Sequence, residues 1–270
     1  MSTLEKPHPE ISGRTRILGI LAHPTDHVKA PPEINRIARS RGKDAVMVPF
    51  NIAPADLAGF IGALRMLQSF DGAIVTVPHK QAILPLCDVI SQRAAAVGAA
   101  NIFRRSADGH LVGDQLDGIG FVNGLTSAGI GMTGKSVYLV GAGGAAHAIA
   151  FALADAGISR LTLANRTVAK AEDLCRKLQI AYPDIVVSVG HGDPSGHDLV
   201  INGTTLGMRP DDELPLDVTK LDSAMIVAEV IMEPEITALL AAATSADCRV
   251  HRGKHMLEHQ LHLMADYLGL

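Results

Sequence analysis

The sequence is poor in the residues that build several common kinds of binding surface. It has no tryptophan, three tyrosines and six phenylalanines, so aromatic residues make up only 3% of the 270 positions. A surface that stacks nucleic-acid bases needs such side chains. The formal net charge of −4 gives no positive field that would hold a phosphate backbone either. We therefore expect no nucleic-acid partner.

Cysteine is also scarce. The three cysteines, Cys87, Cys175 and Cys248, stand far apart and form no Cys-x-x-Cys pair. This sparse, odd number predicts neither a zinc site nor a disulfide framework, and it fits a reducing compartment. His23 and His27, with an aspartate between them, have a spacing that is seen at metal sites. Three loop residues without a further ligand make a weak site, so we expect no bound metal.

Long apolar runs are absent as well. No uninterrupted apolar stretch approaches the length that spans a membrane. Residues 1–9 are polar and broken by prolines, and they lack the apolar core of a signal peptide. We therefore expect a cytoplasmic protein that has no membrane partner. Its partner is expected to be a small-molecule substrate, and the chain is expected to work as a monomer or a homodimer.

What the sequence does contain is a regular alternation of strand-like and helix-like segments. Apolar residues make up 47% of the chain, enough for a sizeable core. The alternation predicts an α/β fold with largely parallel sheets, arranged as two α/β domains. The patterns predict a hairpin across 101–114, strands at 16–22, 45–50, 72–77, 136–140, 160–164, 185–189, 199–202 and 225–230, and helices at 32–41, 57–67, 120–128, 145–156 and 254–267.

A glycine-rich loop lies between the strand at 136–140 and the helix that follows. Gly141, Gly143 and Ala146 match the pattern G-x-G-x-x-G/A. The first glycine permits the tight turn, the second lets the backbone approach a pyrophosphate, and the alanine lets the helix pack close to the sheet. The amides at the helix N-terminus then face the phosphates. This context predicts dinucleotide binding, also by Ala142, Gly144 and Ala145, whereas a merely structural turn is the alternative.

The choice of cofactor is expected to depend on the end of the next strand. An NAD site usually has Asp or Glu there, to bind the ribose hydroxyls. This chain has Asn165, Arg166 and Thr167, followed by Lys170, and no carboxylate before Glu172. Arg166 can hold a 2′-phosphate, and Lys170 adds positive charge. The residues favour NADP, while NAD stays possible; two ordinary surface cations are the alternative.

Lys80 and Asp117 are the candidates for the chemical step. Lys80 ends the run 75–80, and Asp117 lies in the run 113–118. Oxidation of an alcohol requires removal of the hydroxyl proton as hydride leaves, and Lys80 could take that proton or hold the alkoxide electrostatically. Asp117 would fix the position of the ammonium. A buried salt bridge without a catalytic role is the alternative.

The chain resembles the shikimate dehydrogenase family over nearly its whole length. The matching segments occur in the order and spacing of the family, at residues 75–80, 98–101, 113–118, 141–146, 165–167, 202–208 and 256–260. The resemblance implies an N-terminal substrate domain at 1–117 and an NADP-binding Rossmann domain at 118–252. It also implies that the C-terminal helix at 253–270 packs back on the first domain, that a cleft separates the domains, and that Lys80 and Asp117 act as a dyad.

The resemblance also implies roles for individual binding residues. Thr76 and Asn101 match positions that bind ring hydroxyls, and Gln260 matches a substrate-contacting glutamine. Gln115, Val28 and Ala30 fall at further substrate-binding positions. Near the nicotinamide end of the cofactor, the family uses the positions of Thr204, Val230 and Gly253.

Several positions depart from the family pattern. Two serines that bind the substrate carboxylate in the family are Val28 and Ala30 here, and neither side chain can donate a hydrogen bond. Charge-assisted hydrogen bonds are worth roughly 1.5–3 kcal/mol each, so two losses amount to about two to four orders of magnitude in binding. Lys29, His23 or His27 could rebuild the site. Elsewhere, the usual asparagine is Ile74, an Asn-Thr pair is Gln115-Leu116, a tyrosine is Met232, and an aspartate is Glu229.

These residues together predict an NAD(P)-dependent dehydrogenase that acts on a CH–OH group. The changed loop predicts a cyclic hydroxy acid or a related alcohol as substrate, and inefficient turnover of shikimate. Two alternatives stay open at this point. One is a non-catalytic dinucleotide-binding regulatory protein, and the other is an ordinary shikimate dehydrogenase.

Overall fold

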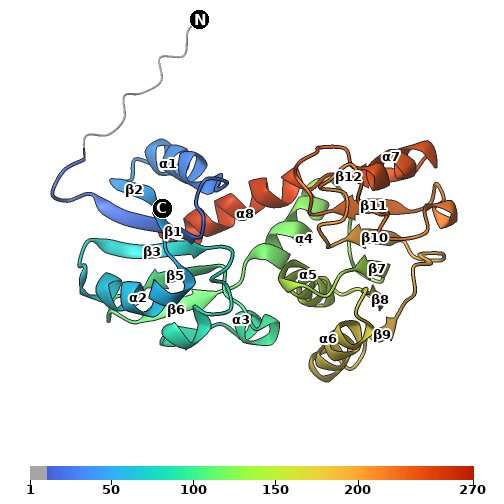
Figure 1. Cartoon of the computed structure of the whole chain (residues 1–270), viewed down its shortest axis with the longest axis horizontal. Helices are drawn as coiled ribbons and strands as arrows, with labels where there is room; N and C mark the ends of the chain where they lie inside the picture. Colours follow the sequence, from blue (N-terminus) through green and yellow to red (C-terminus); the bar gives the residue numbers. More distant parts are fainter. Residues whose placement is uncertain (1–10) are drawn as a thin grey trace, which may run out of the picture. The chain divides into compact units, whose positions relative to one another are not determined.

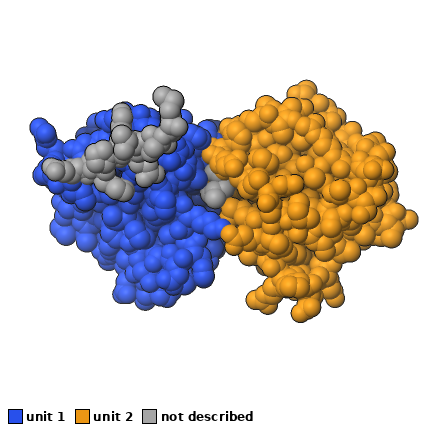
Figure 2. Space-filling view, turned by 90° about the horizontal axis from the view of Figure 1, so that it is seen from above, with its two compact units in different colours: residues 1–116, 261–270 blue, residues 117–260 orange. Residues whose placement is uncertain are grey.

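The computed structural model describes residues 11–270, which form two compact units. Unit 1 comprises the described residues up to Leu116 together with Leu261–Leu270. Unit 2 comprises Asp117–Gln260. Figure 2 colours the units separately. The chain therefore leaves unit 1 just before Asp117 and returns to it directly after Gln260.

Unit 1 is built on a mixed six-stranded sheet with the order β2-β1-β3-β5-β6-β4 (Figure 1). β1 pairs in parallel with both β2 and β3, whereas β5 is antiparallel to β3 and to β6. The elements of this unit are β1 (Arg16–Ala22), α1 (Ala30–Ser40), β2 (Ala45–Asn51), α2 (Leu57–Met66), β3 (Phe70–Val75), β4 (Val89–Ile90), α3 (Gln92–Val97), β5 (Ile102–Arg105) and β6 (Leu111–Asp114), with short 3-10 turns at Pro54–Asp56 and Leu84–Leu86.

The core of unit 1 includes apolar side chains of the helix α2 and of the strands β3 and β5. Leu57, Ile61 and Leu64 repeat on one face of α2, and all three are buried. They belong to one cluster with Phe70 of β3 and Phe103 of β5. Burial of such side chains contributes about 1.5–3 kcal/mol each. The hydrophobic spacing of 57–67 therefore predicted the correct face of the helix.

The last turn of the chain is held by unit 1. The helix α8 (Lys254–Tyr267) begins in unit 2 and ends in unit 1. The Tyr267 hydroxyl donates to Val112 O at 2.8 Å, and Arg41 Nη1 donates to Asp266 Oδ1 and Leu270 O at 2.7 and 2.8 Å. These contacts tie the end of α8 to β6 and to the loop after α1.

Unit 2 contains a fully parallel six-stranded sheet with the order β12-β11-β10-β7-β8-β9. In such a sheet all carboxyl ends of the strands lie at one edge. Its elements are α4 (Asp117–Ser127), β7 (Ser136–Val140), α5 (Gly144–Asp155), β8 (Arg160–Ala164), α6 (Val168–Ala181), β9 (Val186–Val189), β10 (Leu199–Asn202), β11 (Ile226–Glu229), α7 (Ala238–Ser245), β12 (Arg249–His251) and the first part of α8, with a 3-10 turn at Val218–Lys220.

The predicted α/β class is confirmed, and so are most predicted elements. Five helices and strands, β4, α3, α6, α7 and β12, were not predicted; all except α6 are segments of two to eight residues, which show too little periodicity. The first helix of unit 2 starts at Asp117 rather than 120, which places a carboxylate in its first turn, where the helix dipole favours negative charge. Within residues 11–270, no helix is both long and apolar enough to span a membrane.

A glycine in β3 makes the pairing with β5 possible. Gly72 lies opposite Arg104. A methyl group at position 72 would lie 2.8 Å from Arg104 Cα and closer still to Phe103 O. Because backbone atoms cannot move aside cheaply, Gly72→Ala is expected to destabilise unit 1 by about 1–3 kcal/mol in urea unfolding followed by circular dichroism.

Gly62→Ala is the matched control for this prediction. Gly62 is exposed within α2, and a methyl group there would meet nothing within 4 Å. That change should stabilise the helix by about 0.5–1 kcal/mol, because alanine has the higher helix propensity. If both variants unfold at the same urea concentration as the parent, the steric account of Gly72 is wrong.

Candidate functional site

Unit 2 carries a pocket of about 430 Å³ at the carboxyl edge of its sheet. Four segments reach it, and each directly follows one strand: 141–145 after β7, 165–170 after β8, 203–205 after β10, and Val230 after β11. The pocket is lined by Gly141, Ala142, Gly143, Gly144, Ala145, Asn165, Arg166, Thr167, Lys170, Gly203, Thr204, Thr205 and Val230. The structure thus brings together eleven residues that the sequence predicted to bind a dinucleotide.

The glycine-rich loop has the geometry of a phosphate cradle. Gly141 has a φ of +118°, a conformation that L side chains rarely adopt, and its amide donates to Ala164 O at 2.7 Å. Gly143 precedes the first turn of α5, and a methyl group at Gly143 or Gly144 would meet nothing within 4 Å. The loop therefore leaves the helix N-terminus open to an anion. These residues fit the pyrophosphate of a dinucleotide.

The side of the pocket formed by the segment after β8 is positively charged. Arg166 and Lys170 are exposed, and none of the described residues that line the pocket is acidic. The side-chain Nδ2 of Asn165 donates a hydrogen bond to Thr167 O at 2.8 Å and so shapes the turn that carries Arg166. A guanidinium and an ammonium without a competing carboxylate suit a 2′-phosphate better than two ribose hydroxyls.

The part of the pocket formed by the segment after β10 is organised by Asn202. Its Oδ1 accepts hydrogen bonds from the Thr204 amide and hydroxyl at 3.1 and 2.7 Å, and its Nδ2 donates to Leu206 O at 2.9 Å. The Thr204 hydroxyl in turn accepts from the Leu206 amide at 3.0 Å. Sequence reasoning selected Thr204 from the run 202–208 but missed Asn202, Gly203 and Thr205.

Gly253 is not among the residues that line the pocket. A methyl group at this position would lie 2.6 Å from Val230 C and closer still to Ile231 O. Gly253 therefore lets two backbone segments approach each other next to Val230. A direct contact between Gly253 and a cofactor stays a prediction.

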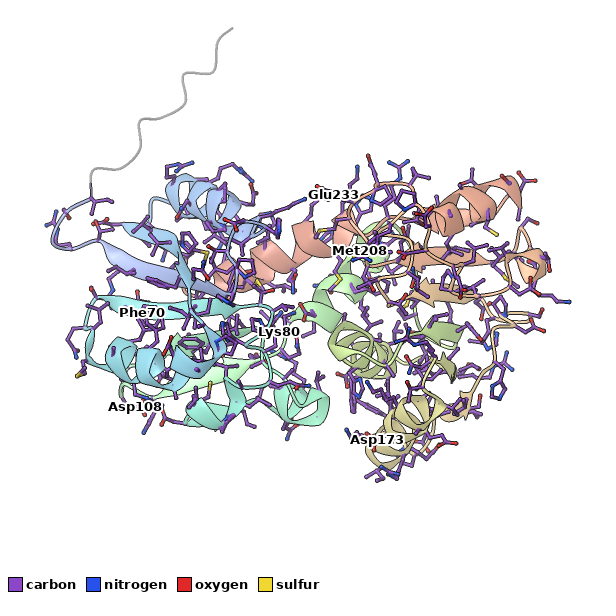
Figure 3. All side chains as sticks on the ribbon, viewed as in Figure 1. Phe70, Lys80, Asp108, Asp173, Met208 and Glu233 are labelled. Atoms are coloured by element: carbon purple, nitrogen blue, oxygen red, sulfur yellow. The ribbon has the colours of Figure 1, made fainter. Side chains whose placement is uncertain are left out.

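In unit 1, one asparagine joins the segments that carry the predicted substrate-binding residues. Asn101 is buried, its carbonyl accepts from the Val75 amide at 2.7 Å, and its Oδ1 accepts from the Leu116 amide at 2.8 Å. The neighbouring Ala100 amide donates to Lys80 O at 2.8 Å. The segments that carry Thr76, Lys80, Asn101 and Gln115 are thus held together. Figure 3 labels Lys80 on the segment beyond β3.

In unit 2, Asp117 is buried at the start of α4. The Gln260 amide donates a hydrogen bond to Asp117 Oδ1. Gly120, one turn along α4, leaves room for Gln260, because a methyl group there would lie 2.8 Å from Gln260 Cβ. Gln260, which the family resemblance assigned to the substrate, is therefore also a partner of the predicted catalytic carboxylate. Lys80 and Asp117 belong to different units, and their action as a dyad stays a prediction.

The loop between β1 and α1 shows how the two missing serines are accommodated. Ala30 is buried as the first residue of α1, and Val28 is half-buried, with its amide donating to Thr25 O at 3.1 Å. His23 Nδ1 lies 2.9 Å from Asn51 Oδ1, so this imidazole already has a polar contact on β2. Positions 28 and 30 offer only aliphatic side chains to a ligand.

Comparisons with known proteins agree with the motifs. The family model described as "Shikimate dehydrogenase substrate binding domain" matches residues 20–103, and the model "Shikimate / quinate 5-dehydrogenase" matches residues 125–188. A curated relative from Moorella thermoacetica, named shikimate dehydrogenase (NADP(+)), is 38% identical over 258 residues, which cover 93% of this chain and 87% of the relative.

Two solved structures are similar throughout. A shikimate dehydrogenase in complex with NADP+ has a TM-score of 0.91 and 31% identity, covering 98% of this chain and 94% of its own. The 5-ketofructose reductase of Gluconobacter sp. strain CHM43 has a TM-score of 0.85 and 28% identity, covering 96% of this chain and 99% of its own.

Two of these relatives are named with NADP, the predicted cofactor, and the similarity covers both units. The predicted NADP dependence is confirmed for the family members that the chain matches. We conclude that the chain belongs to the shikimate dehydrogenase family and is, as its motifs predicted, a nicotinamide-dependent dehydrogenase that acts on a CH–OH group.

Proposed function

We propose that the chain is an NADP-dependent dehydrogenase for a cyclic hydroxy acid or a related alcohol, and that it turns over shikimate inefficiently. Unit 1 would bind the substrate and unit 2 the cofactor. The observation that carries the proposal is the aliphatic pair Val28 and Ala30 at the positions where the family binds the substrate carboxylate. We also propose that the protein is cytoplasmic and acts as a monomer or a homodimer.

The local structure supports a changed carboxylate site. A carboxylate is stabilised by side-chain or backbone donors, and neither aliphatic side chain supplies one. The Val28 amide is already bonded to Thr25 O, and His23 contacts Asn51. One structural relative of the same fold is named a 5-ketofructose reductase, and that sugar has no carboxylate. The fold is thus compatible with a neutral polyhydroxy substrate.

The chemical step would be performed by residues of both units. When bound, NADP supplies the acceptor for the hydride. Lys80 would take the hydroxyl proton or hold the developing alkoxide, and Asp117 would hold the ammonium in place. Gln260 would orient Asp117 through its amide. Thr76 and Asn101 would bind hydroxyls of the substrate, with Gln115 beside them in the segment that Asn101 supports.

An ordinary shikimate dehydrogenase is the competing function, since the curated relative bears that name. A non-catalytic regulatory protein is less well supported, because both Lys80 and Asp117 are retained. Rates of NADP reduction with shikimate, quinate and other cyclic alcohols separate the three functions. We expect slow shikimate oxidation beside faster oxidation of another compound.

Restoration of the hydroxyls tests the carboxylate argument. The double variant Val28→Ser with Ala30→Ser should raise kcat/KM for shikimate by about two to four orders of magnitude, because two charge-assisted hydrogen bonds become available. The rate with the best neutral alcohol serves as the control and should not rise. An efficient parent enzyme, or a double variant without improvement, would show that the loop binds carboxylates in another way.

Removal of the lysine amine tests the mechanism. Lys80→Ala should lower kcat by about two to four orders of magnitude, the usual contribution of a positioned acid–base group. Binding of NADPH, followed by its fluorescence, should be unchanged, because Lys80 lies outside the pocket of unit 2. Retained turnover in this variant would refute the proposed role.

The preference for NADP is expected to depend on Arg166. Arg166→Ala should raise KM for NADP by about tenfold to a hundredfold, the value of one charge-assisted hydrogen bond, and change KM for NAD little. Arg176→Ala is the matched control, because Arg176 is an exposed arginine of α6 that pairs with Asp173. Equal effects on both cofactors would mean that Arg166 does not read the 2′-phosphate.

A further inference from the structure

A buried histidine lies in the turn that carries the predicted catalytic lysine. This turn, residues 76–80, follows β3 and is called the Lys80 turn below. Two of its residues, Val77 and Pro78, are exposed, whereas His79 is only 1% exposed. The imidazole is thus buried directly before the residue that is expected to take part in proton transfer. The chemistry proposed above gives this side chain no role.

The imidazole joins the Lys80 turn to the loop after β2. Its Nε2 lies 2.9 Å from Ile52 O. Because a carbonyl oxygen can only accept a hydrogen bond, Nε2 carries a proton and donates. A buried carbonyl that loses its donor is costly, so this contact has a strong preference to form. His79 therefore ties the end of β3 to the end of β2.

Backbone hydrogen bonds hold the first half of the Lys80 turn on the end of β1. The Thr76 amide donates to Leu21 O at 2.9 Å. The His23 amide donates to Val77 O at 3.2 Å. These contacts do not involve the imidazole, so we expect Thr76, a predicted substrate-binding residue, to keep its position without it.

The second half of the Lys80 turn has one anchor on each side of Lys80. After Lys80 Cα, the Ala100 amide donates to Lys80 O at 2.8 Å. Before Lys80 Cα, the His79 side chain is fixed on Ile52 O. One anchored atom leaves a residue free to rotate about it, whereas two anchors on opposite sides set the direction of the side chain. The orientation of Lys80 therefore depends on His79.

We propose that His79 is a positioning residue for Lys80: by donating to Ile52 O, it orients the Lys80 turn so that the amine reaches the substrate hydroxyl. The inference rests on the proposed function, in which Lys80 takes the hydroxyl proton or holds the alkoxide while hydride leaves for the cofactor. Such a group acts only within hydrogen-bond reach of its proton. His79 is therefore expected to influence the chemical step rather than the binding of either ligand.

The first experiment compares His79→Phe, which has no donor, with His79→Gln, whose side-chain amide can still donate to Ile52 O. His79→Phe should lower kcat by about tenfold to a hundredfold, between the value of one hydrogen bond and that of a misplacement by about 1 Å. KM for the alcohol should change little, because Thr76 keeps its backbone bonds. His79→Gln should restore most of kcat.

The probe is the compound that the parent oxidises fastest among shikimate, quinate and the other cyclic alcohols. His110→Phe is the matched control, because His110 is an exposed histidine of the same unit that contacts Asp108. This control should leave kcat unchanged. If His79→Phe is as active as the parent, or if His79→Gln is as slow as His79→Phe, the inference is wrong.

A double-mutant cycle separates positioning from a purely structural role. If His79 acts through Lys80, His79→Phe should have no further effect on kcat in the Lys80→Ala background, because the group that it orients is gone. A purely structural role predicts the same fold-change in both backgrounds, and that result would overturn the inference.

His79→Asn keeps the test usable if His79→Phe does not fold. Its amide is one methylene shorter than that of Gln and does not reach Ile52 O, so this variant should be as slow as His79→Phe. Circular dichroism and urea unfolding show whether each variant is folded. If neither His79→Phe nor His79→Asn folds, the histidine is required for the fold itself, and the positioning role is overturned.

Affinity for NADPH distinguishes failure of this inference from failure of the proposed function. It should be equal in all these variants, because His79 belongs to unit 1 and does not line the pocket of unit 2. A lower affinity in His79→Phe would contradict a local effect on Lys80. A parent that oxidises none of the alcohols, or a fully active Lys80→Ala, would refute the proposed function together with this inference. A slow Lys80→Ala beside a fast His79→Phe refutes only the role of His79.

Discussion

Close approach of backbone segments at the carboxyl edge of one parallel sheet is the constraint on which the pocket of unit 2 depends. Gly141, Gly203 and Ala146 meet there, and each is too small to keep its neighbours apart. A methyl group at Gly203 would lie 3.1 Å from Ala146 Cβ, and one at Gly141 would lie 3.0 Å from Gly203 O. Small residues at these positions bring the glycine-rich loop, the start of α5 and the loop after β10 into one pocket.

Each unit contains a buried asparagine whose side chain accepts a hydrogen bond from a backbone amide. Asn101 in unit 1 and Asn202 in unit 2 are both buried, and each uses its side chain to hold backbone amides of a loop that carries predicted site residues. An asparagine suits this role because its amide both donates and accepts hydrogen bonds without carrying charge. Two of the predicted site residues, Lys80 and Thr204, are thereby placed by neighbours that need not touch a ligand.

Charge separates the roles of the remaining polar residues. Arg166 and Lys170 are exposed basic side chains, and we expect them to distinguish cofactors by a phosphate group. Glu229 is fully buried beside the same pocket, and burial raises the pKa of its carboxyl group to about 7. The loop between β1 and α1 has only aliphatic side chains at Val28 and Ala30, where the family resemblance implies serines.

The sequence by itself determined the fold class, the family and eleven of the residues that line the pocket of unit 2. Glycine spacing after a buried strand, and the basic pair after the next strand, are local properties that a linear pattern records. Only the tertiary structure decided that Asn202 shapes the wall beside Thr204, that Gly253 spaces Val230 rather than lining the pocket, and that Gln260 contacts Asp117. It also decided that Glu229 is fully buried beside Asn202 and Thr237. These relations join residues that are distant in sequence or hidden by strand pairing, and packing rather than local propensity creates them.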